Sequence, residues 1–182
     1  DYISTDKPFE TSLDEIFQRM LPNRDLEQKI SKAILSEDLI ADEASPALAT
    51  IRRNMRAANL RIKDVLHKYI SGGSYAKYLQ ENIVTLRDGR YVVPVRAECR
   101  GEVPGLLHDT SASGATLFIE PLAVVESNNE LRLLERKEAD EIERILSELS
   151  ADIAASASAI MENYRNLTLL AFIFGKSQLS FK

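Results

Sequence analysis

The sequence predicts a mainly α-helical fold that carries one small antiparallel β unit. Long stretches on both sides of the middle repeat apolar residues at steps of three and four, as amphipathic helices do. Between them, residues 83–119 are rich in β-branched and aromatic residues interrupted by turns containing Gly and Ser. Each helical stripe is narrow, and packing the two stripes together buries both. We therefore expect long antiparallel helical arms with a short β tip and a helical base.

The composition limits the possible classes of protein. Hydrophobic residues make up 45% of the 182 residues, which excludes wholesale disorder. The net charge of -5 excludes a uniformly basic nucleic-acid binder, so contact with phosphate requires a local patch. The single cysteine, Cys99, which we interpret as a small strand residue, excludes an intramolecular disulfide and favours a cytoplasmic location.

The ends and the apolar segments of the chain show no targeting signal. The most apolar stretch, Leu167–Phe174, is too short to span a membrane, and we recognise no signal peptide. The chain starts at Asp1 without a methionine and stops directly after a helical pattern. We expect it to be a piece of a longer protein, without membrane partners.

Residues 1–43 are expected to form the helical base. Helices are predicted over Ser12–Leu21 and Asp25–Ile40, separated at Pro22, and Asn23 or Asp25 provides the second N-cap. The first arm occupies 44–75. It begins at Ser45-Pro46, ends at Ser71-Gly72-Gly73, and carries one apolar stripe. The stripe consists of Leu48, Ile51, Met55, Ala58, Ile62, Val65 or Leu66, and Tyr69.

Residues 76–120 are expected to form the β tip. Asp88-Gly89 is a two-residue hairpin turn, because Gly accepts positive φ. Pro94 cannot donate a ladder hydrogen bond, so its strand should lie at an edge or contain a bulge. The predicted strands are Ile83–Arg87, Arg90–Val95, Glu102–His108 and Thr116–Ile119, with a loop at Asp109–Gly114.

Residues 121–182 are expected to form the second arm, which returns to the base as one helix from Pro121 onward. Ser150–Ala159 is a run of small residues that permits close approach of a neighbouring backbone. The stripe consists of Leu131, Leu134, Ile142, Ile145 or Leu146, Leu149, Ile153, Ile160, Tyr164, Leu167 and Ala171.

The β tip carries candidate nucleic-acid contacts. Arginine donates two hydrogen bonds to a phosphate, tyrosine stacks on a base or sugar, and serine hydroxyls bind phosphate or sugar. Against this, residues 81–120 contain four basic and six acidic groups. The alternative is that these charges only solvate strand edges and deter aggregation. The candidate residues are Arg87, Arg90, Tyr91, Arg96, Arg100, Ser111 and Ser113.

Other motifs favour structural interpretations. Basic residues on the first arm, including Arg52, Arg56 and Lys63, are expected to pair with acidic residues of Glu135–Glu148. Gly175-Lys176-Ser177 lacks the preceding strand and glycine of a phosphate loop. His108, Asp109, Ser111 and Ser113 are neighbours on one loop, which rarely yields a catalytic triad, and the hydroxyls are expected to satisfy backbone groups. The histidines and Cys99 lack metal-ligand spacing.

Several segments resemble the MutS family, most closely its second bacterial branch, MutS-two. The resemblance rests on Arg90–Arg96 (RYVVPVR), Gly101-x-Val-Pro-Gly105, His108–Pro121 (HDTSASGATLFIEP) and Asn128–Leu131 (NNEL). It implies a helical core and lever arms with a reduced clamp at the tip. It also implies a homodimer that encircles nucleic acid, and in full-length members an ATPase domain using ATP and magnesium and an Smr endonuclease domain. That family is associated with branched DNA, suppression of recombination and rescue of collided ribosomes.

We therefore expect a core, lever and clamp fragment of a MutS-like DNA-binding protein. Its tip would touch DNA or ribosomal RNA without reading base sequence, and its arms would transmit ATPase-driven motion. Neither added domain is present, so we expect no catalytic residue, no cofactor and no enzymatic activity in these residues. The alternative is a dimerisation or protein-interaction scaffold without direct nucleic-acid contact.

Overall fold

The computed structural model describes residues 11 and 13–180. Within that part of the chain the fold is mainly helical with two small antiparallel sheets, which confirms the predicted class. The chain divides into two compact units. Unit 1 combines the residues up to Ala41 with those from Arg144 onward, and unit 2 comprises Asp42–Glu143. Each unit is described by itself.

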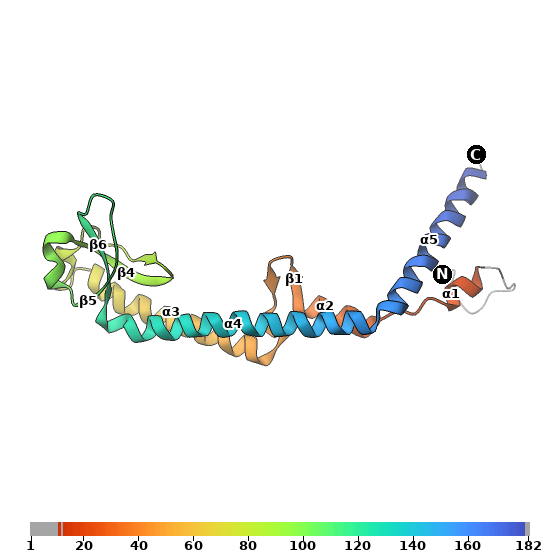
Figure 1. The fold of residues 1–182 in the computed structure, drawn as a ribbon, viewed down its shortest axis with the longest axis horizontal. Coiled ribbons are helices and arrows are strands. Elements are labelled where there is room, and N and C mark those ends of the chain that lie inside the picture. The colour runs from red at the N-terminus through yellow and green to blue at the C-terminus, as the bar shows by residue number, and fades with distance from the viewer. Residues whose placement is uncertain (1–10, 12, 181–182) are drawn as a thin grey trace. The chain divides into compact units, whose positions relative to one another are not determined.

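Figure 1 shows the elements along the chain. The α-helices are α1 (Asp14–Gln18), α2 (Arg24–Ala33), α3 (Pro46–Ile70), α4 (Leu122–Ala155) and α5 (Ala157–Ser180). The strands are β1 (Ile34–Ser36), β2 (Leu39–Ile40), β3 (Thr85–Arg87), β4 (Arg90–Arg96), β5 (Gly105–Thr110) and β6 (Thr116–Pro121). Short 3₁₀ turns are η1 (Asp42–Ala44), η2 (Ala76–Tyr78) and η3 (Ala97–Glu102).

Helix α3 starts and stops where the sequence predicts. The Ser45 hydroxyl accepts a hydrogen bond from the Leu48 amide at 2.9 Å, and Pro46 occupies the first turn. Beyond the last residue, Gly72 adopts a φ of 89°, a conformation that favours glycine. Four stripe positions are buried: Leu48, Ala58, Ile62 and Leu66.

In unit 2, α3 packs antiparallel to the first part of α4. Arg52 pairs with Glu138 at 2.6 Å, and Arg61 pairs with Glu130 at 2.5 Å, so the partners run in opposite chain order. The Ser45 hydroxyl also donates to Glu141 at 2.6 Å. The expected ion pairing of α3 with the acidic part of α4 is confirmed for Arg52, but it is wrong for Arg56, which pairs with Asp42, and for Lys63, which pairs with no residue the structure describes.

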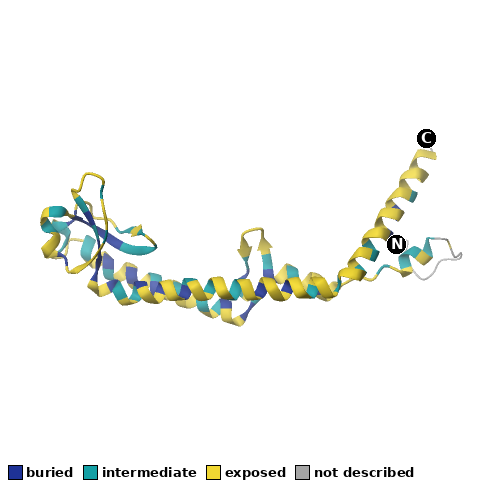
Figure 2. Ribbon diagram, in the orientation of Figure 1, coloured by how far each residue is buried: buried dark blue, intermediate teal, exposed yellow. Residues whose placement is uncertain are grey.

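The larger sheet has the strand order β3-β4-β6-β5 and is antiparallel throughout. Alternate residues of β4 and β6, namely Val93, Val95, Leu117 and Ile119, join one core cluster with residues of both helices. From α3 this cluster contains Ala58, Ile62 and Leu66, and from α4 it contains Val124 and Leu131. These residues form the dark blue zone around the sheet in Figure 2. The two helices therefore cover one face of the sheet.

Unit 1 contains α1, α2, the β1–β2 hairpin, the end of α4 and α5. Asn23 caps α2, as predicted, by accepting from the Leu26 amide at 3.4 Å. The amide of Asn163 on α5 satisfies both backbone groups of Leu21, at 2.9 and 2.7 Å. Lys29 on α2 pairs with Asp152 on α4 at 2.8 Å. These polar contacts tie the N-terminal segment to the C-terminal helices.

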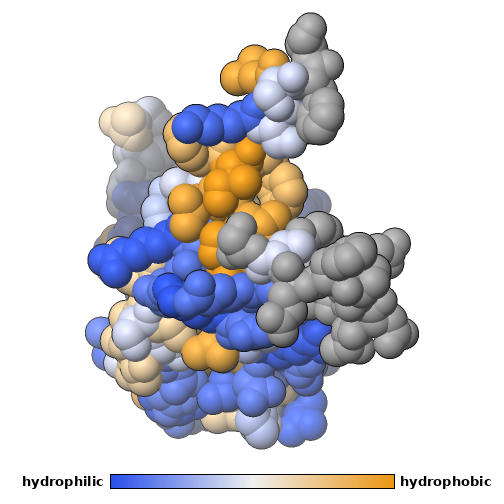
Figure 3. All heavy atoms as spheres, turned by 90° about the vertical axis from the view of Figure 1, so that its right-hand side faces the viewer, coloured by the Kyte–Doolittle hydropathy of each residue, from blue (hydrophilic) through white to orange (hydrophobic). Residues whose placement is uncertain are grey.

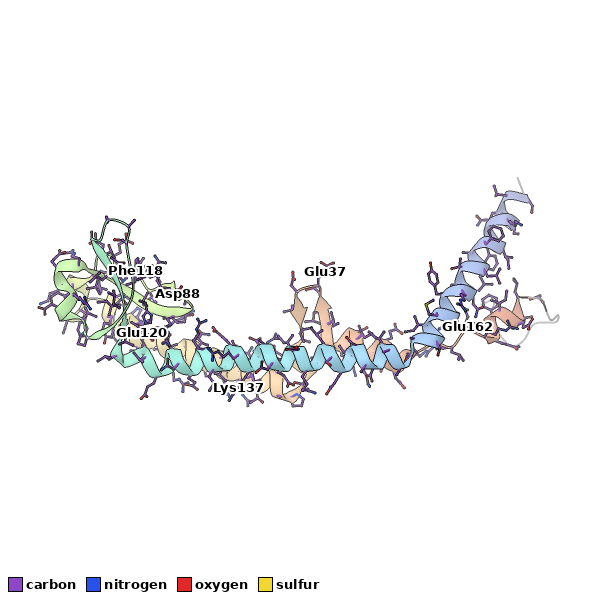
Figure 4. All side chains as sticks on the ribbon, in the orientation of Figure 1. Glu37, Asp88, Phe118, Glu120, Lys137 and Glu162 are labelled. Atoms are coloured by element: carbon purple, nitrogen blue, oxygen red, sulfur yellow. The ribbon has the colours of Figure 1, made fainter. Side chains whose placement is uncertain are left out.

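Two helix predictions in unit 1 are wrong. Helix α2 ends at Ala33, and the next residues form the β1–β2 hairpin, with Glu37 near its tip (Figure 4). The Ala41 amide donates a hydrogen bond to the Ala33 carbonyl at the base of this hairpin. The long second helix is divided at Ser156, whose amide is shared between the carbonyls of Asp152 and Ile153.

The predicted apolar stripe of α5 is largely exposed in unit 1. The buried residues of helix α5 are Asn166 and Leu170, and neither belongs to that stripe. Figure 3 views the side on which α5 lies and shows hydrophobic side chains at the surface. The exposed ones on α5 include Ile160, Met161, Tyr164, Leu167, Leu169, Phe172 and Phe174.

Three predictions in unit 2 need correction. His108 and Asp109, predicted as loop neighbours of Ser111 and Ser113, lie in strand β5. Cys99 lies in the 3₁₀ turn η3, not in a strand. Strand β4, which contains Pro94, is interior in the strand order, not an edge. Pro94 interrupts no hydrogen bond with β3, because the pairing of β4 with β3 ends at Val92. On the same side of β4, the Pro94 carbonyl accepts a hydrogen bond from the Gln80 amide at 2.8 Å. Strand β3 therefore ends before it reaches the proline.

Candidate nucleic-acid interface

The β3–β4 hairpin is fixed by its turn and by α4. Asp88 and Gly89 have φ angles of 49° and 72°, as the predicted two-residue turn requires. The Arg132 side chain on α4 donates to the Asp88 carbonyl at 2.7 Å. A Cβ on Gly89 would lie 2.4 Å from Arg132 Nη1, so only glycine leaves room for this contact. The hairpin is held against the helix.

One end of the sheet is anchored through the fully buried carboxylate of Glu120. Its Oε1 accepts from Arg90 Nη1 at 2.9 Å and from Asn128 Nδ2 at 2.7 Å. Its Oε2 lies 2.5 Å from His108 Nε2. A buried charge is stable only when paired and hydrogen-bonded, and these three partners meet that need. Glu120 thereby joins β4, β5 and β6 to α4 (Figure 4).

Asn128 and Asn129 extend this anchor along α4. The buried Asn128 amide donates to the Tyr91 carbonyl at 3.2 Å and accepts from the Tyr91 amide at 3.3 Å. Asn129 accepts from Arg90 Nη2 at 2.7 Å. Both terminal nitrogens of the Arg90 guanidinium are therefore engaged inside the unit, which reduces the capacity of Arg90 to bind a phosphate.

The side chains of Arg87 and Tyr91 also make contacts within unit 2. The Arg87 guanidinium lies 4.0 Å from the ring centre of Phe118 on β6, and its Nε lies 3.2 Å from an Asp109 oxygen on β5. Because β4 lies between β3 and β6, this side chain crosses the face of the sheet opposite the helices. The Tyr91 hydroxyl donates to Asn59 on α3 at 2.8 Å. Both residues are candidate ligand contacts by sequence, and the structure shows each with an internal partner.

The opposite end of the sheet carries the two remaining arginines. Arg96 is the last residue of β4 and lies opposite Thr116, the first residue of β6. Arg100 follows in η3. Both side chains are exposed, and neither makes an ion pair or hydrogen bond with any residue the structure describes. The four arginines thus separate into two that hold the sheet together and two that face solvent.

The loop Ser111–Ala115 lies beside Arg96. The Ala115 carbonyl accepts from the Ala97 amide at 3.0 Å, which fixes the loop against the start of η3. Ser111 accepts from the Thr116 amide at 3.0 Å, and Ser113 accepts from the Ala115 amide at 3.4 Å. The prediction that these hydroxyls satisfy backbone groups is confirmed. Ser113 is exposed in this loop, which leads into β6 at Thr116, the residue opposite Arg96.

Sequence reasoning missed the anchoring residues Glu120 and Asn128. The signal was present, because Glu120 interrupts an apolar run from Leu117 to Pro121, where a charge requires a buried partner. Nothing in the sequence identified the partners, since Arg90, His108 and Asn128 come from three other elements.

The structure offers no phosphate loop, metal cluster or membrane span in the part it describes. Gly175-Lys176-Ser177 lies inside helix α5, which confirms the interpretation of that motif. Among the described residues, no group of three or more metal-ligating side chains is gathered in one place. No helix in the same residues is long and apolar enough to cross a membrane.

Comparison with known proteins finds close relatives along nearly the whole chain. It is 51% identical over 166 residues to Endonuclease MutS2 of Ruminiclostridium cellulolyticum, covering 91% of this chain and 21% of the relative. The match to Endonuclease MutS2 of Acetivibrio thermocellus is 51% over 180 residues, covering 99% of the chain and 22% of the relative. The match to Endonuclease MutS2 of Pelotomaculum thermopropionicum is 52% over 168 residues, covering 92% and 21%. No protein-family model matches. The chain thus spans about a fifth of the length of these relatives.

Proposed function

Because this chain belongs to the MutS2 family, we propose that it acts within a longer DNA-binding protein as the segment that grips nucleic acid without reading base sequence. The relatives carry the name endonuclease, and we propose that their ATP- and magnesium-dependent and nuclease activities reside in residues beyond these 182. In this proposal the segment is the helical core, the lever and a reduced clamp, and the protein works as a cytoplasmic homodimer.

The observation that carries the proposal is the division of the β-unit arginines. Arg87 and Arg90 are engaged by Asp109, Phe118, Glu120 and Asn129, whereas Arg96 and Arg100 are exposed, and Arg96 lies opposite Thr116 at the end of the serine loop. An arginine without an internal partner retains its full set of donors for a phosphate. We therefore place the phosphate contact at the free end of the sheet, with Arg96, Arg100 and Ser113 as its donors.

The anchored end supports a mechanical role for the sheet. Glu120 and Asn128 connect the strands directly to α4, and Arg132 connects the hairpin turn to the same helix. A movement of α4 would therefore carry the sheet with it as one body. We propose that ATPase-driven motion of the full-length protein reaches the nucleic acid through this connection, whether the ligand is branched DNA or ribosomal RNA.

The test is nucleic-acid binding by full-length MutS2 protein containing this segment. The double variant Arg96→Ala, Arg100→Ala should weaken binding by a similar factor on every sequence and reduce the salt slope, log Kd against log[salt], by about 2, near 0.9 for each phosphate contact. Fluorescence anisotropy at several salt concentrations, with duplex DNA, branched DNA and ribosomal RNA fragments, measures both quantities. Glu98→Gln, which removes a negative charge from the same turn, is the matched control and should not reduce the salt slope. An unchanged slope in the double variant would remove the proposal.

A second function, a protein-interaction or dimerisation scaffold, is favoured by the exposed apolar face of α5. Such a face on a helix is more often covered by protein than left in water. Light scattering after size exclusion tests this role by measuring whether the 182-residue chain is a monomer or a dimer. A dimer that dissociates when Leu167 and Phe172 are changed to Gln supports it, and a monomer at millimolar concentration counts against it.

A further inference from the structure

We propose that one face of α3 forms a second phosphate-binding surface, which we call the α3 stripe. It consists of Arg53, Arg56, Leu60, Lys63 and His67. These residues follow one another at steps of three and four, so they lie on a single side of the helix. All five are exposed, and none belongs to the buried side that packs on the sheet and α4.

Charge is strongly segregated within unit 2. Helix α3 has six basic residues and one acidic residue, a net charge of +5, although Asp42–Glu143 as a whole has fourteen basic and sixteen acidic residues, a net charge of -2. A basic helix on an acidic unit concentrates positive potential along one line, where it attracts a polyanion.

Internal ion pairs engage the cations beside the stripe more fully than those in it. Arg52 and Arg61 reach Glu138 and Glu130 on α4. In contrast, Arg53 and Lys63 have no ion pair or hydrogen bond with any residue the structure describes. Arg56 reaches Asp42 at 3.2 Å, but its side chain stays 63% exposed and Asp42 also serves Arg52. The stripe therefore keeps its charge toward solvent.

The spacing of the stripe fits a nucleic-acid backbone. From position 53 to position 67 the helix rises about 21 Å, at about 1.5 Å for each residue. Along B-DNA this length corresponds to roughly six phosphates of one strand, at about 3.4 Å for each phosphate. A duplex lying along the helix can therefore bring several phosphates to the cations of the stripe, with DNA or RNA as their source. The inference concerns a surface separate from the free end of the sheet, but it rests on the proposed function for the class of ligand.

The experiment uses full-length MutS2 protein containing this segment and the triple variant Arg53→Gln, Arg56→Gln, Lys63→Gln. If the stripe contacts phosphate, the salt slope of binding should fall by between 2 and 3 at about 0.9 for each contact, and affinity at low salt should fall at least tenfold. Duplex DNA and duplex RNA are measured separately, and the duplex with the larger change in slope is the source of the phosphates. Circular dichroism before binding checks that helix content is unchanged.

The matched control is Arg136→Gln, Lys137→Gln on α4, which removes two exposed cations from the neighbouring helix (Figure 4 labels Lys137). An unchanged salt slope in the triple variant overturns the inference. An equal fall in salt slope per cation removed in the control and in the triple variant also overturns it. If the triple variant loses binding to polyglutamate but binds both duplexes with an unchanged affinity and slope, the inference is also overturned, in favour of an acidic protein partner. The Arg96→Ala, Arg100→Ala variant separates the two proposals: a normal slope there with a reduced slope in the triple variant refutes the sheet contact and retains the stripe.

Discussion

Replacement of Glu120 by glutamine should destabilise unit 2 more than any exposed charge substitution. The variant keeps the shape of the side chain but removes the charge that Arg90 and His108 approach. It also places an amide NH₂ where a carboxylate oxygen now contacts Arg90 or His108, so one acceptor atom is lost. Loss of one partner from a buried ion pair typically costs about 3–5 kcal/mol. Because Arg90 is one-quarter exposed and retains Asn129, we expect about 3 kcal/mol, at the lower end of that range.

Urea denaturation of the 182-residue chain measures this loss. Tyrosine fluorescence is a suitable signal, because the chain has no tryptophan and four of its six tyrosines (Tyr69, Tyr75, Tyr78 and Tyr91) belong to unit 2. With a denaturant slope of about 2 kcal/mol/M, the midpoint should fall by about 1.5 M. Glu126→Gln, at an exposed position on α4, is the control and should shift the midpoint by less than about 0.3 M. Equal midpoints for the two variants would refute the idea that the buried carboxylate anchors the sheet.

Two further predictions concern the hairpin turn and acid stability. Gly89→Ala should cost more stability than Gly114→Ala in urea unfolding: both glycines have positive φ, which costs about 1–2 kcal/mol for alanine, but only the Cβ at Gly89 also displaces Arg132 from the Asp88 carbonyl. Equal losses would show that the Arg132 contact contributes nothing. Hydrogen bonds from Arg52 and Arg56 lower the pKa of Asp42 below its ordinary value of 3.8, so its stabilising effect should be complete at neutral pH and be lost as the pH falls below about 4 through the folded-state pKa. Thermal unfolding from pH 7 to pH 2 should therefore show a steeper acid loss for the native chain than for Asp42→Asn, and identical profiles would contradict this.

Much of the fold follows from local signals. Ser45-Pro46, Ser71-Gly72-Gly73 and Asp88-Gly89 each fix a boundary through the backbone conformations their residues favour, and each boundary is found in place. The buried side of α3 was predicted because its apolar period matches the helical repeat. These features depend on residues close together in the chain, which is why sequence alone sufficed.

Other features depend on contacts that the sequence does not encode locally. The β1–β2 hairpin was predicted as helix because residues 34–40 contain no glycine or asparagine to mark a turn. The break at Ser156 lies in a run of small residues with good or neutral helix propensity, and no proline signals it. The roles of the four arginines differ only because Glu120, Asp109 and Asn129 approach two of them. Residue type indicated capacity for phosphate, whereas tertiary structure decides which side chains remain available.

The most direct test of the account is site-specific crosslinking from the free end of the sheet. A photoreactive phenylalanine analogue replaces Ser113 in full-length MutS2 protein containing this segment, and replaces Ala139, an exposed position on α4, in a parallel sample. After irradiation with labelled branched DNA or ribosomal RNA, we expect strong crosslinks from position 113 that decline when Arg96 and Arg100 are changed to Ala, and weak crosslinks from position 139. Equal yields from the two positions, or no crosslink from position 113 to either ligand under conditions in which the protein is bound, would contradict it.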